Sequence, residues 1–211
     1  MTSIVSEWNW KDIFQAAATV VALIGLFFAI YQYRLAQRWQ KSRFAAELTE
    51  KFHSDEDLIL AWRFLDWHDR QIVLPSKFSE DGKNPQKFFY SIEKLAGAMS
   101  MQNREKSPNT GLLDLRDGYR THEYLVYVEI FDRFFDYITQ IYGYLRNRLV
   151  DEEDLTTVFY ILHRLDNFTF QQKKIFQGYL QAYDYRDVLR MIEMARASGD
   201  FNYLETAGKN G

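Results

Sequence analysis

The segment spanning residues 13–33 carries no charged residue, and it constrains the fold more than any other feature of this 211-residue chain. As an α-helix its 21 residues extend about 31 Å, close to the ~30 Å hydrocarbon thickness of a bilayer. Asp12 and Arg34 bound the segment. Aromatic side chains of the kind that favour membrane interfaces lie near both ends: Trp8, Trp10, Tyr31, Tyr33 and Trp39. The pattern predicts a transmembrane helix.

Two other interpretations of such a segment fit the sequence less well. A signal peptide has a basic start and a cleavage site after its apolar stretch. Here Glu7, Lys11 and Asp12 precede the stretch and no cleavage site follows it. A buried core helix of this length usually shows a polar face, and this segment shows almost none.

The charges that flank the segment predict its orientation. Four basic residues follow it closely: Arg34, Arg38, Lys41 and Arg43. Only Lys11 precedes it. Cytoplasmic flanks of spans are enriched in Lys and Arg, so we expect the N-terminus outside and the rest of the chain in the cytoplasm. The basic flank is also expected to meet anionic headgroups. The absence of cysteine agrees with a reducing compartment.

Small residues recur along one face of the predicted span. They are Ala18, Ala22, Gly25 and Ala29. Small side chains let helix backbones approach closely in lipid, so this face is a candidate self-association surface and predicts a homo-oligomer. The alternative is that Ala and Gly are simply common in membrane helices.

The remainder of the chain is predicted to be helical, because the sequence holds only 10 Gly and 3 Pro. Within residues 121–148, apolar side chains recur every three or four positions. Residues 70–86 and 102–118 are polar and predict connections, with a short extended piece at residues 72–74. The fold class expected is all-α, with one N-terminal transmembrane helix continuing into a cytosolic helical bundle.

The sequence patterns also place the helices. One long helix covers about residues 12–52, and a second begins at an N-cap on Ser54. A short helix covers residues 87–101, and the last helices break near residues 183–185.

The predicted organisation has five parts. The parts are an extracytoplasmic tail (1–12), the transmembrane helix (13–33), a juxtamembrane helix (34–53), a cytosolic α-helical domain (54–204) and a frayed tail (205–211).

Sequence patterns for chemistry are weak, and we predict no catalytic, cofactor-binding or metal-binding residue. The net charge of −3 argues against a nucleic-acid partner, and no phosphate-binding glycine loop or nucleophile elbow occurs. Acidic residues with an adjacent arginine do share one helix face: Glu129, Asp132, Arg133 and Asp136. We interpret them as a candidate polar interaction face. The alternative is a metal-dependent hydrolase that uses this face or the His163–Asp166 pair.

Three stretches of the chain resemble a group of small bacterial single-span membrane proteins, catalogued only as a domain of unknown function. They are "YQYRLAQRWQKSRFAAELTEKFHSDEDL", "IFDRFFDYITQIYGYLRNRLVDEEDL" and "YLQAYDYRDV". The resemblance is one of layout over most of the chain. It implies a bacterial inner (plasma) membrane and an all-α cytosolic domain, and it supplies no catalytic residue.

The sequence therefore predicts a non-enzymatic, membrane-anchored helical module for protein interaction, which self-associates. Its expected partners are the lipid bilayer, further copies of itself and an unknown cytosolic protein. The alternative is a membrane-perturbing effector of bacterial stress or phage defence whose span oligomerises, although a wholly apolar span lines a pore poorly.

Overall fold

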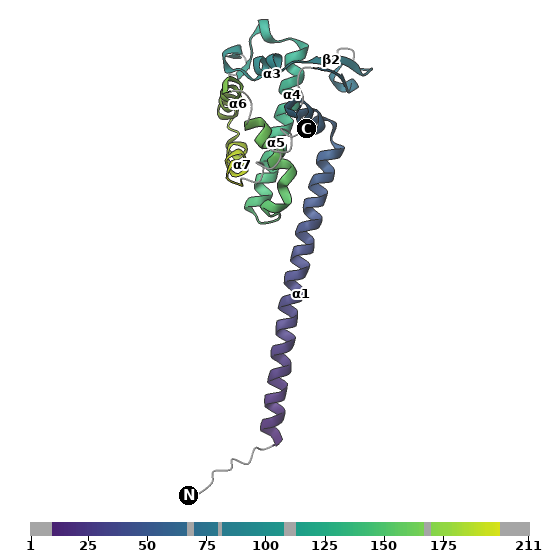
Figure 1. Cartoon of the computed structure of the whole chain (residues 1–211), viewed down its shortest axis with the longest axis vertical. Helices are drawn as coiled ribbons and strands as arrows, with labels where there is room; N and C mark the ends of the chain where they lie inside the picture. The colour runs from purple at the N-terminus through teal and green to yellow at the C-terminus, as the bar shows by residue number, and fades with distance from the viewer. Residues whose placement is uncertain (1–9, 67–69, 80–81, 108–112, 167–169, 199–211) are drawn as a thin grey trace, which may run out of the picture. The chain divides into compact units, whose positions relative to one another are not determined.

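The computed structural model describes residues 10–66, 70–79, 82–107, 113–166 and 170–198. By its contacts the chain divides into two compact units, Met1–Phe44 and Ala45–Gly211. We call the second one the folded unit. Its helices and the long N-terminal helix confirm the predicted fold class (Figure 1). The helices are α1 (Trp10–Ser54), α2 (Glu56–Asp66), α3 (Ile92–Met99), α4 (His122–Arg146), α5 (Thr156–Asp166), α6 (Phe170–Ala182) and α7 (Arg186–Ala197).

The junction between α1 and α2 lies one residue later than the sequence suggested. The Ser54 hydroxyl donates back to the Lys51 carbonyl at 3.1 Å, so Ser54 closes α1. The Asp55 carboxylate instead accepts a hydrogen bond from the Asp57 amide at 3.0 Å. The expected N-cap at Ser54 is therefore wrong. Asp55 satisfies a free amide at the start of α2, and its charge suits the positive end of that helix.

The last turns of α1 belong to the folded unit. Ala45, Leu48 and Phe52 are buried in it, at the three- and four-residue spacing of one helix face. The Tyr137 hydroxyl on α4 donates to the Leu48 carbonyl at 2.8 Å. Burial raises the pKa of Tyr137 to about 12, so this hydroxyl remains a donor at any physiological pH.

Helix α4 is the centre of the folded unit, with α2, α3 and α7 packed against it. Its aromatic residues build the core. The ring of Phe64 on α2 lies 4.8 Å from Tyr90 and 5.2 Å from Tyr127 of α4, measured between ring centroids. The ring of Phe131 on α4 lies 5.5 Å from Phe176 on α6. All five side chains are buried, so this cluster ties the N-terminal and C-terminal helices to α4.

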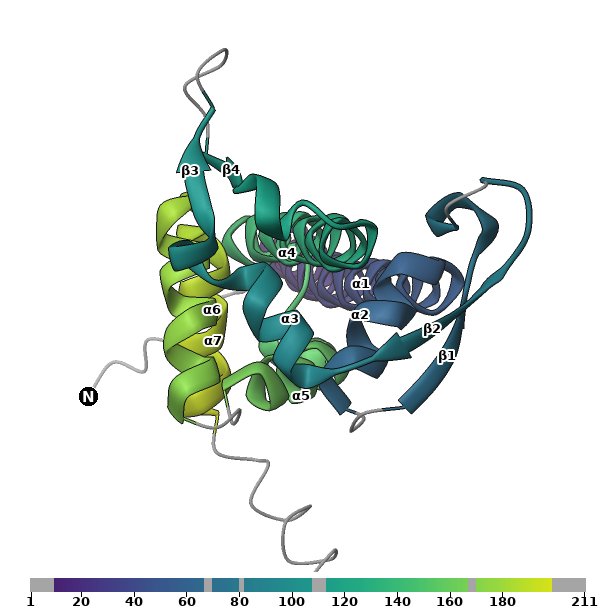
Figure 2. The same cartoon turned by 90° about the horizontal axis from the view of Figure 1, so that it is seen from above.

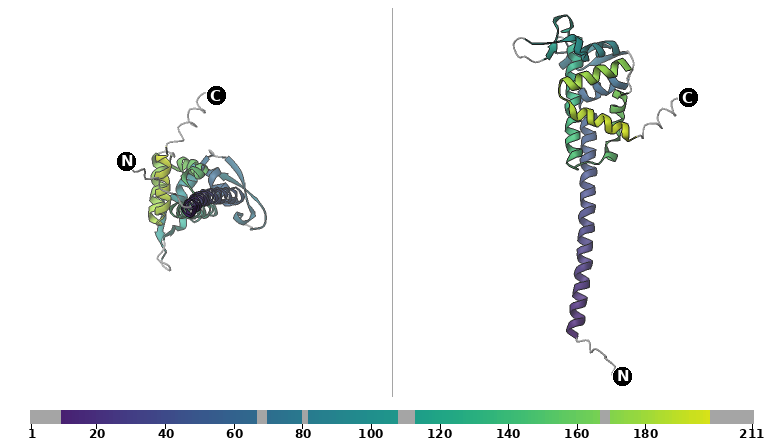
Figure 3. Two further views of the ribbon diagram at one scale, coloured as in Figure 1. Left: turned by 90° about the horizontal axis from the view of Figure 1, so that it is seen from below. Right: turned by 90° about the vertical axis from the view of Figure 1, so that its left-hand side faces the viewer.

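Two short antiparallel hairpins interrupt the helices. Strand β1 (Arg70–Leu74) pairs with β2 (Gln86–Tyr90), and β3 (Arg104–Lys106) pairs with β4 (Leu113–Leu115). The hairpins lie at different edges of the folded unit, and β1–β2 is on the side away from α6 and α7 (Figures 2 and 3).

The β1–β2 hairpin corrects part of the sequence prediction. A helix was expected from residue 87, whereas residues 87–90 form most of β2 and the short helix, α3, begins at Ile92. Phe88 and Tyr90 are buried and Phe89 is exposed, which is the two-residue period of a strand. The extended piece expected at residues 72–74 is part of β1.

Two helices are followed, two residues past their ends, by a residue with left-handed backbone geometry. Arg148 has φ 58° and Asp184 has φ 60°. After α4 the Leu149 amide donates to the Tyr144 carbonyl at 2.9 Å, and after α6 the Tyr185 amide donates to the Leu180 carbonyl at 2.8 Å. These are Schellman turns, in which glycine normally occupies the left-handed position. The second turn confirms the predicted break near residues 183–185.

The variant Arg148→Gly is expected to stabilise the folded unit. A non-glycine residue in left-handed geometry is strained by about 1 kcal/mol, and glycine removes that strain. We expect the melting temperature of the detergent-solubilised full chain to rise by about 2–4 °C. Arg146→Gly, placed inside the last turn of α4, is the control and should lower it, because glycine weakens a helix interior. An unchanged or lower melting temperature in Arg148→Gly would contradict the assignment of strain.

Candidate functional site

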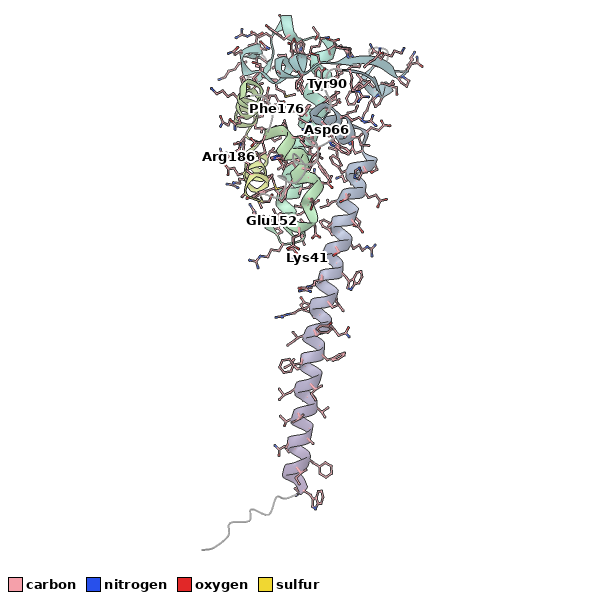
Figure 4. The ribbon with its side chains drawn as sticks, in the orientation of Figure 1. Lys41, Asp66, Tyr90, Glu152, Phe176 and Arg186 are labelled. Carbon is pink, nitrogen blue, oxygen red and sulfur yellow. The ribbon has the colours of Figure 1, made fainter. Side chains whose placement is uncertain are left out.

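The first candidate site is the apolar part of α1. This helix includes a stretch long and apolar enough to cross a membrane by length and composition, and none of that stretch is buried. The side chains of residues 13–40 are all exposed, and they project outward on all sides of the helix before Lys41 (Figure 4). An apolar surface of this extent in a soluble protein would ordinarily be covered by other residues or by a partner.

Two sets of predicted residues lie on opposite faces of this helix. The small residues Ala18, Ala22, Gly25 and Ala29 form one stripe at about 100° per residue. A Cβ atom added at Gly25 would meet no described atom within 4 Å, so the stripe is open. Arg34, Arg38 and Lys41 follow the same spacing but point to the other side, and Arg43 returns to the side of the stripe.

The predicted polar face on α4 is divided between two separate clusters. Arg133 turns toward the junction of α1 and α2, where its guanidinium donates to the Asp55 carboxylate at 2.8 Å and lies 3.2 Å from the Asp57 carboxylate. Asp132, on the neighbouring position, turns toward α6. Glu129 and Asp136 are exposed. Asp132 and Arg133 are therefore held by different elements of the folded unit.

Asp57 is a buried carboxylate with two cationic neighbours. Its side chain is only 4% exposed, and Lys77 from the 3-10 turn after β1 lies 2.5 Å from it. Arg133 on α4 approaches its other oxygen. The nearby Arg133 guanidinium also lowers the pKa of Asp55 against the opposing effect of burial, so that carboxylate stays ionised. This cluster fastens α2, α4 and the segment after β1 to one another.

The second cluster surrounds Asp132 and was not predicted from the sequence. The Tyr179 hydroxyl on α6 donates to the Asp132 carboxylate. The buried Arg104 on β3 donates to the Tyr183 hydroxyl at 2.7 Å and to the Ala98 carbonyl at 2.8 Å. Its guanidinium carbon lies 4.7 Å from the centre of the Tyr179 ring and 5.1 Å from that of Tyr183, which is cation–π geometry.

Burial dominates the electrostatics of this second cluster. It raises the pKa of Asp132, although the Tyr179 hydroxyl and the Arg104 charge oppose the shift. It also raises the pKa of Tyr179 and of Tyr185, and the carboxylate of Asp132 adds to both shifts. The tyrosines therefore stay protonated at neutral pH and act as hydrogen-bond donors.

The variant Asp132→Asn is expected to have a larger free energy of unfolding than the wild type at pH 7. An acid whose pKa rises on folding binds more protons when folded, so the free energy of unfolding falls as the pH rises from 3.8 through the raised value. Asparagine keeps an acceptor oxygen for Tyr179 and removes the buried charge. The advantage should shrink as the pH falls toward 4, measured by urea unfolding at several pH values. A difference in the free energy of unfolding between the variant and the wild type that does not change with pH would contradict the raised pKa of Asp132.

Three further features bear on whether the folded unit holds a reaction centre. Within the described ranges, no three His, Asp or Glu side chains gather as metal ligands would. Asp166, the partner of His163 in the predicted alternative, accepts from the Arg196 guanidinium through both carboxylate oxygens. A hollow of about 50 Å³ lies among α5, α6 and α7, next to Phe176 and Ile192. It is far smaller than the roughly 300–1,000 Å³ of most ligand pockets.

No family model, curated protein or solved structure matches the chain. The resemblance to small bacterial single-span proteins therefore stays a prediction from the residues quoted for it.

Proposed function

We propose that the chain is a non-enzymatic, membrane-anchored module for protein interaction, placed in a bacterial inner membrane. In this proposal α1 spans the bilayer, its N-terminus lies outside, and the folded unit binds a protein partner in the cytoplasm. The observation that carries the proposal is the apolar α1, whose residues 13–40 are all exposed. A lipid bilayer is the solvent that such a surface fits.

The contacts of the folded unit support interaction over catalysis. Two of its acidic side chains are held by neighbours within the unit: Asp57 by Lys77 and Arg133, and Asp132 by the Tyr179 hydroxyl. Groups held in this way join secondary-structure elements of the folded unit.

Orientation can be tested directly because the chain has no cysteine. Single cysteines are introduced as Ser3→Cys and as Gln181→Cys, and intact cells are treated with a membrane-impermeant maleimide. We expect labelling at position 3 in intact cells and at position 181 only after permeabilisation, as the basic flank of the span requires. The reverse pattern would overturn the proposed orientation.

Partner binding is tested by crosslinking in native membranes, followed by a pull-down of the tagged full chain and of a chain lacking residues 1–33. We expect both to recover the same stoichiometric partner, because the folded unit makes the contact. Recovery of further copies of the chain alone, with no partner, would favour self-assembly in the membrane as the function and would overturn the proposal.

Self-association of the span is the part of the proposal that depends on its small residues. We expect Ala22→Leu and Gly25→Leu each to weaken association by about 1 kcal/mol or more, because a large side chain separates two backbones that pack closely. Ala16→Leu is the matched control, since Ala16 lies on the opposite face of the helix. The measurement is a two-hybrid assay in membranes. Equal signals from Ala16→Leu and Ala22→Leu would contradict this interface.

A further inference from the structure

The outer face of the β1–β2 hairpin exposes two apolar side chains next to each other. Val73 is 61% exposed and Phe89 is 55% exposed, the largest exposures of large apolar residues described in the folded unit. Val73 pairs with Lys87, and Gln71 pairs with Phe89. Val73 and Phe89 are therefore diagonal neighbours on one face, within reach of a single side chain from a partner.

The hairpin also has an open edge. The sheet has two strands, and β1 lies on its outer side (Figure 2). Apart from the ladder with β2, the backbone of residues 71–74 makes no hydrogen bond with any other residue that the structure describes. An edge strand with unpaired amide and carbonyl groups is a template for another extended chain.

The charge on this face is positive. Lys87 is exposed on the same face, opposite Val73 and two residues before Phe89, and it forms no ion pair with a described residue. The inner face of the same hairpin is buried against Phe64 and Tyr127, so the hairpin is held in place from behind. A strand edge with a lysine beside two exposed apolar side chains favours a partner of opposite charge.

We propose that the β1–β2 hairpin is the docking surface of the interaction module, and that its occupant is an acidic, extended segment of a partner protein. This segment adds a strand beside β1. Its apolar side chain covers Val73 and Phe89, and a carboxylate meets Lys87. The inference rests on the proposed function and names the surface and the chemistry of the partner.

The test uses the full chain in nanodiscs of zwitterionic phosphatidylcholine and a fluorescent peptide with valine and glutamate in turn at every second position and threonine between them. Valine and glutamate then lie on the same face of the added strand. Two peptides are compared with this peptide, one with lysine for glutamate and one N-methylated along the edge that would pair. Fluorescence anisotropy gives the dissociation constants. We expect the acidic peptide to bind about tenfold more tightly than either comparison peptide, since charge and backbone pairing both contribute.

Variants then locate the bound peptide. Val73→Ser combined with Phe89→Ser should weaken binding about tenfold, as loss of a central apolar contact does. Lys87→Glu should reverse the preference between the acidic and basic peptides. Leu149→Ser is the control for loss of an exposed apolar side chain, and Lys106→Glu on β3 is the control for charge reversal. Both should leave the dissociation constant unchanged.

Several outcomes would overturn the proposal. One is equal binding of the acidic and basic peptides. Another is a loss of peptide affinity in Leu149→Ser equal to that in the double serine variant. A third is a lower oligomeric mass of the double serine variant, which would make a second copy of the chain the occupant. The result is separate from the test of the proposed function. A native partner that is still captured by the double serine variant would leave the interaction module standing and remove the hairpin as its surface.

Discussion

The double variant Leu23→Arg with Ile24→Arg is expected to release the chain from the membrane fraction. These positions lie at the middle of the uncharged segment, where each arginine disfavours insertion by about 2.5–3.5 kcal/mol. Two together are expected to disfavour insertion by roughly 5–7 kcal/mol if their effects add. The measurement is extraction of membranes with alkaline carbonate, followed by quantification of the pellet and the supernatant.

The control adds the same two charges outside the segment, as Gln37→Arg with Gln40→Arg. Both positions are exposed on α1, where further basic residues agree with the proposed cytoplasmic flank. This variant should stay in the pellet. If the chain with Leu23→Arg and Ile24→Arg also stays there, then α1 is not what holds the chain in the membrane.

Phe131→Ala is expected to lower the free energy of unfolding of the folded unit by about 3–5 kcal/mol, which is the range for a large buried aromatic residue. Phe131 is fully buried at the centre of α4. Its ring centroid lies 5.5 Å from that of Phe176, 5.8 Å from that of Phe135 and 6.4 Å from that of Phe64. Alanine would leave a cavity that three helices line.

The same substitution at an exposed position is the control. Phe89→Ala should change the free energy of unfolding by less than about 0.5 kcal/mol, because that ring is more than half exposed. Unfolding of the full chain in urea is followed by near-ultraviolet circular dichroism, which reports the aromatic core. Equal changes from the two variants would contradict the central place of Phe131.

The sequence was sufficient to predict the helices because their signals are local. Residues 122–146 carry a three-to-four-residue apolar period, and the side chain of Thr121 accepts from the Tyr124 amide as an N-cap does. The strand at residues 86–90 was not predicted, because its conformation depends on pairing with a second strand. Pairing with residues 70–74 decides the conformation, and no short window of the sequence contains both strands.

The polar clusters were predictable only in part. The sequence placed Asp132 and Arg133 on one helix, where adjacent side chains point about 100° apart. In the folded unit Asp132 contacts Tyr179 on α6, and Arg133 contacts Asp55 at the start of α2. The burial of Arg104 was not predicted, because an arginine in a polar stretch is normally expected at the surface. Its contacts with the Ala98 carbonyl and with Tyr179 and Tyr183, which lie far along the chain, explain its burial.

The Arg104–Tyr183 contact has a consequence for biosynthesis, because 79 residues separate its partners. At about 5–20 residues per second, a ribosome completes Tyr183 about 4–16 s after Arg104. During that interval the guanidinium can reach the Ala98 carbonyl but lacks Tyr179 and Tyr183, so the segment around β3 is not yet held against α6. The last-made helices then complete the folded unit. A chain released before Tyr179 would keep α1, yet would present proteases with an unfinished domain.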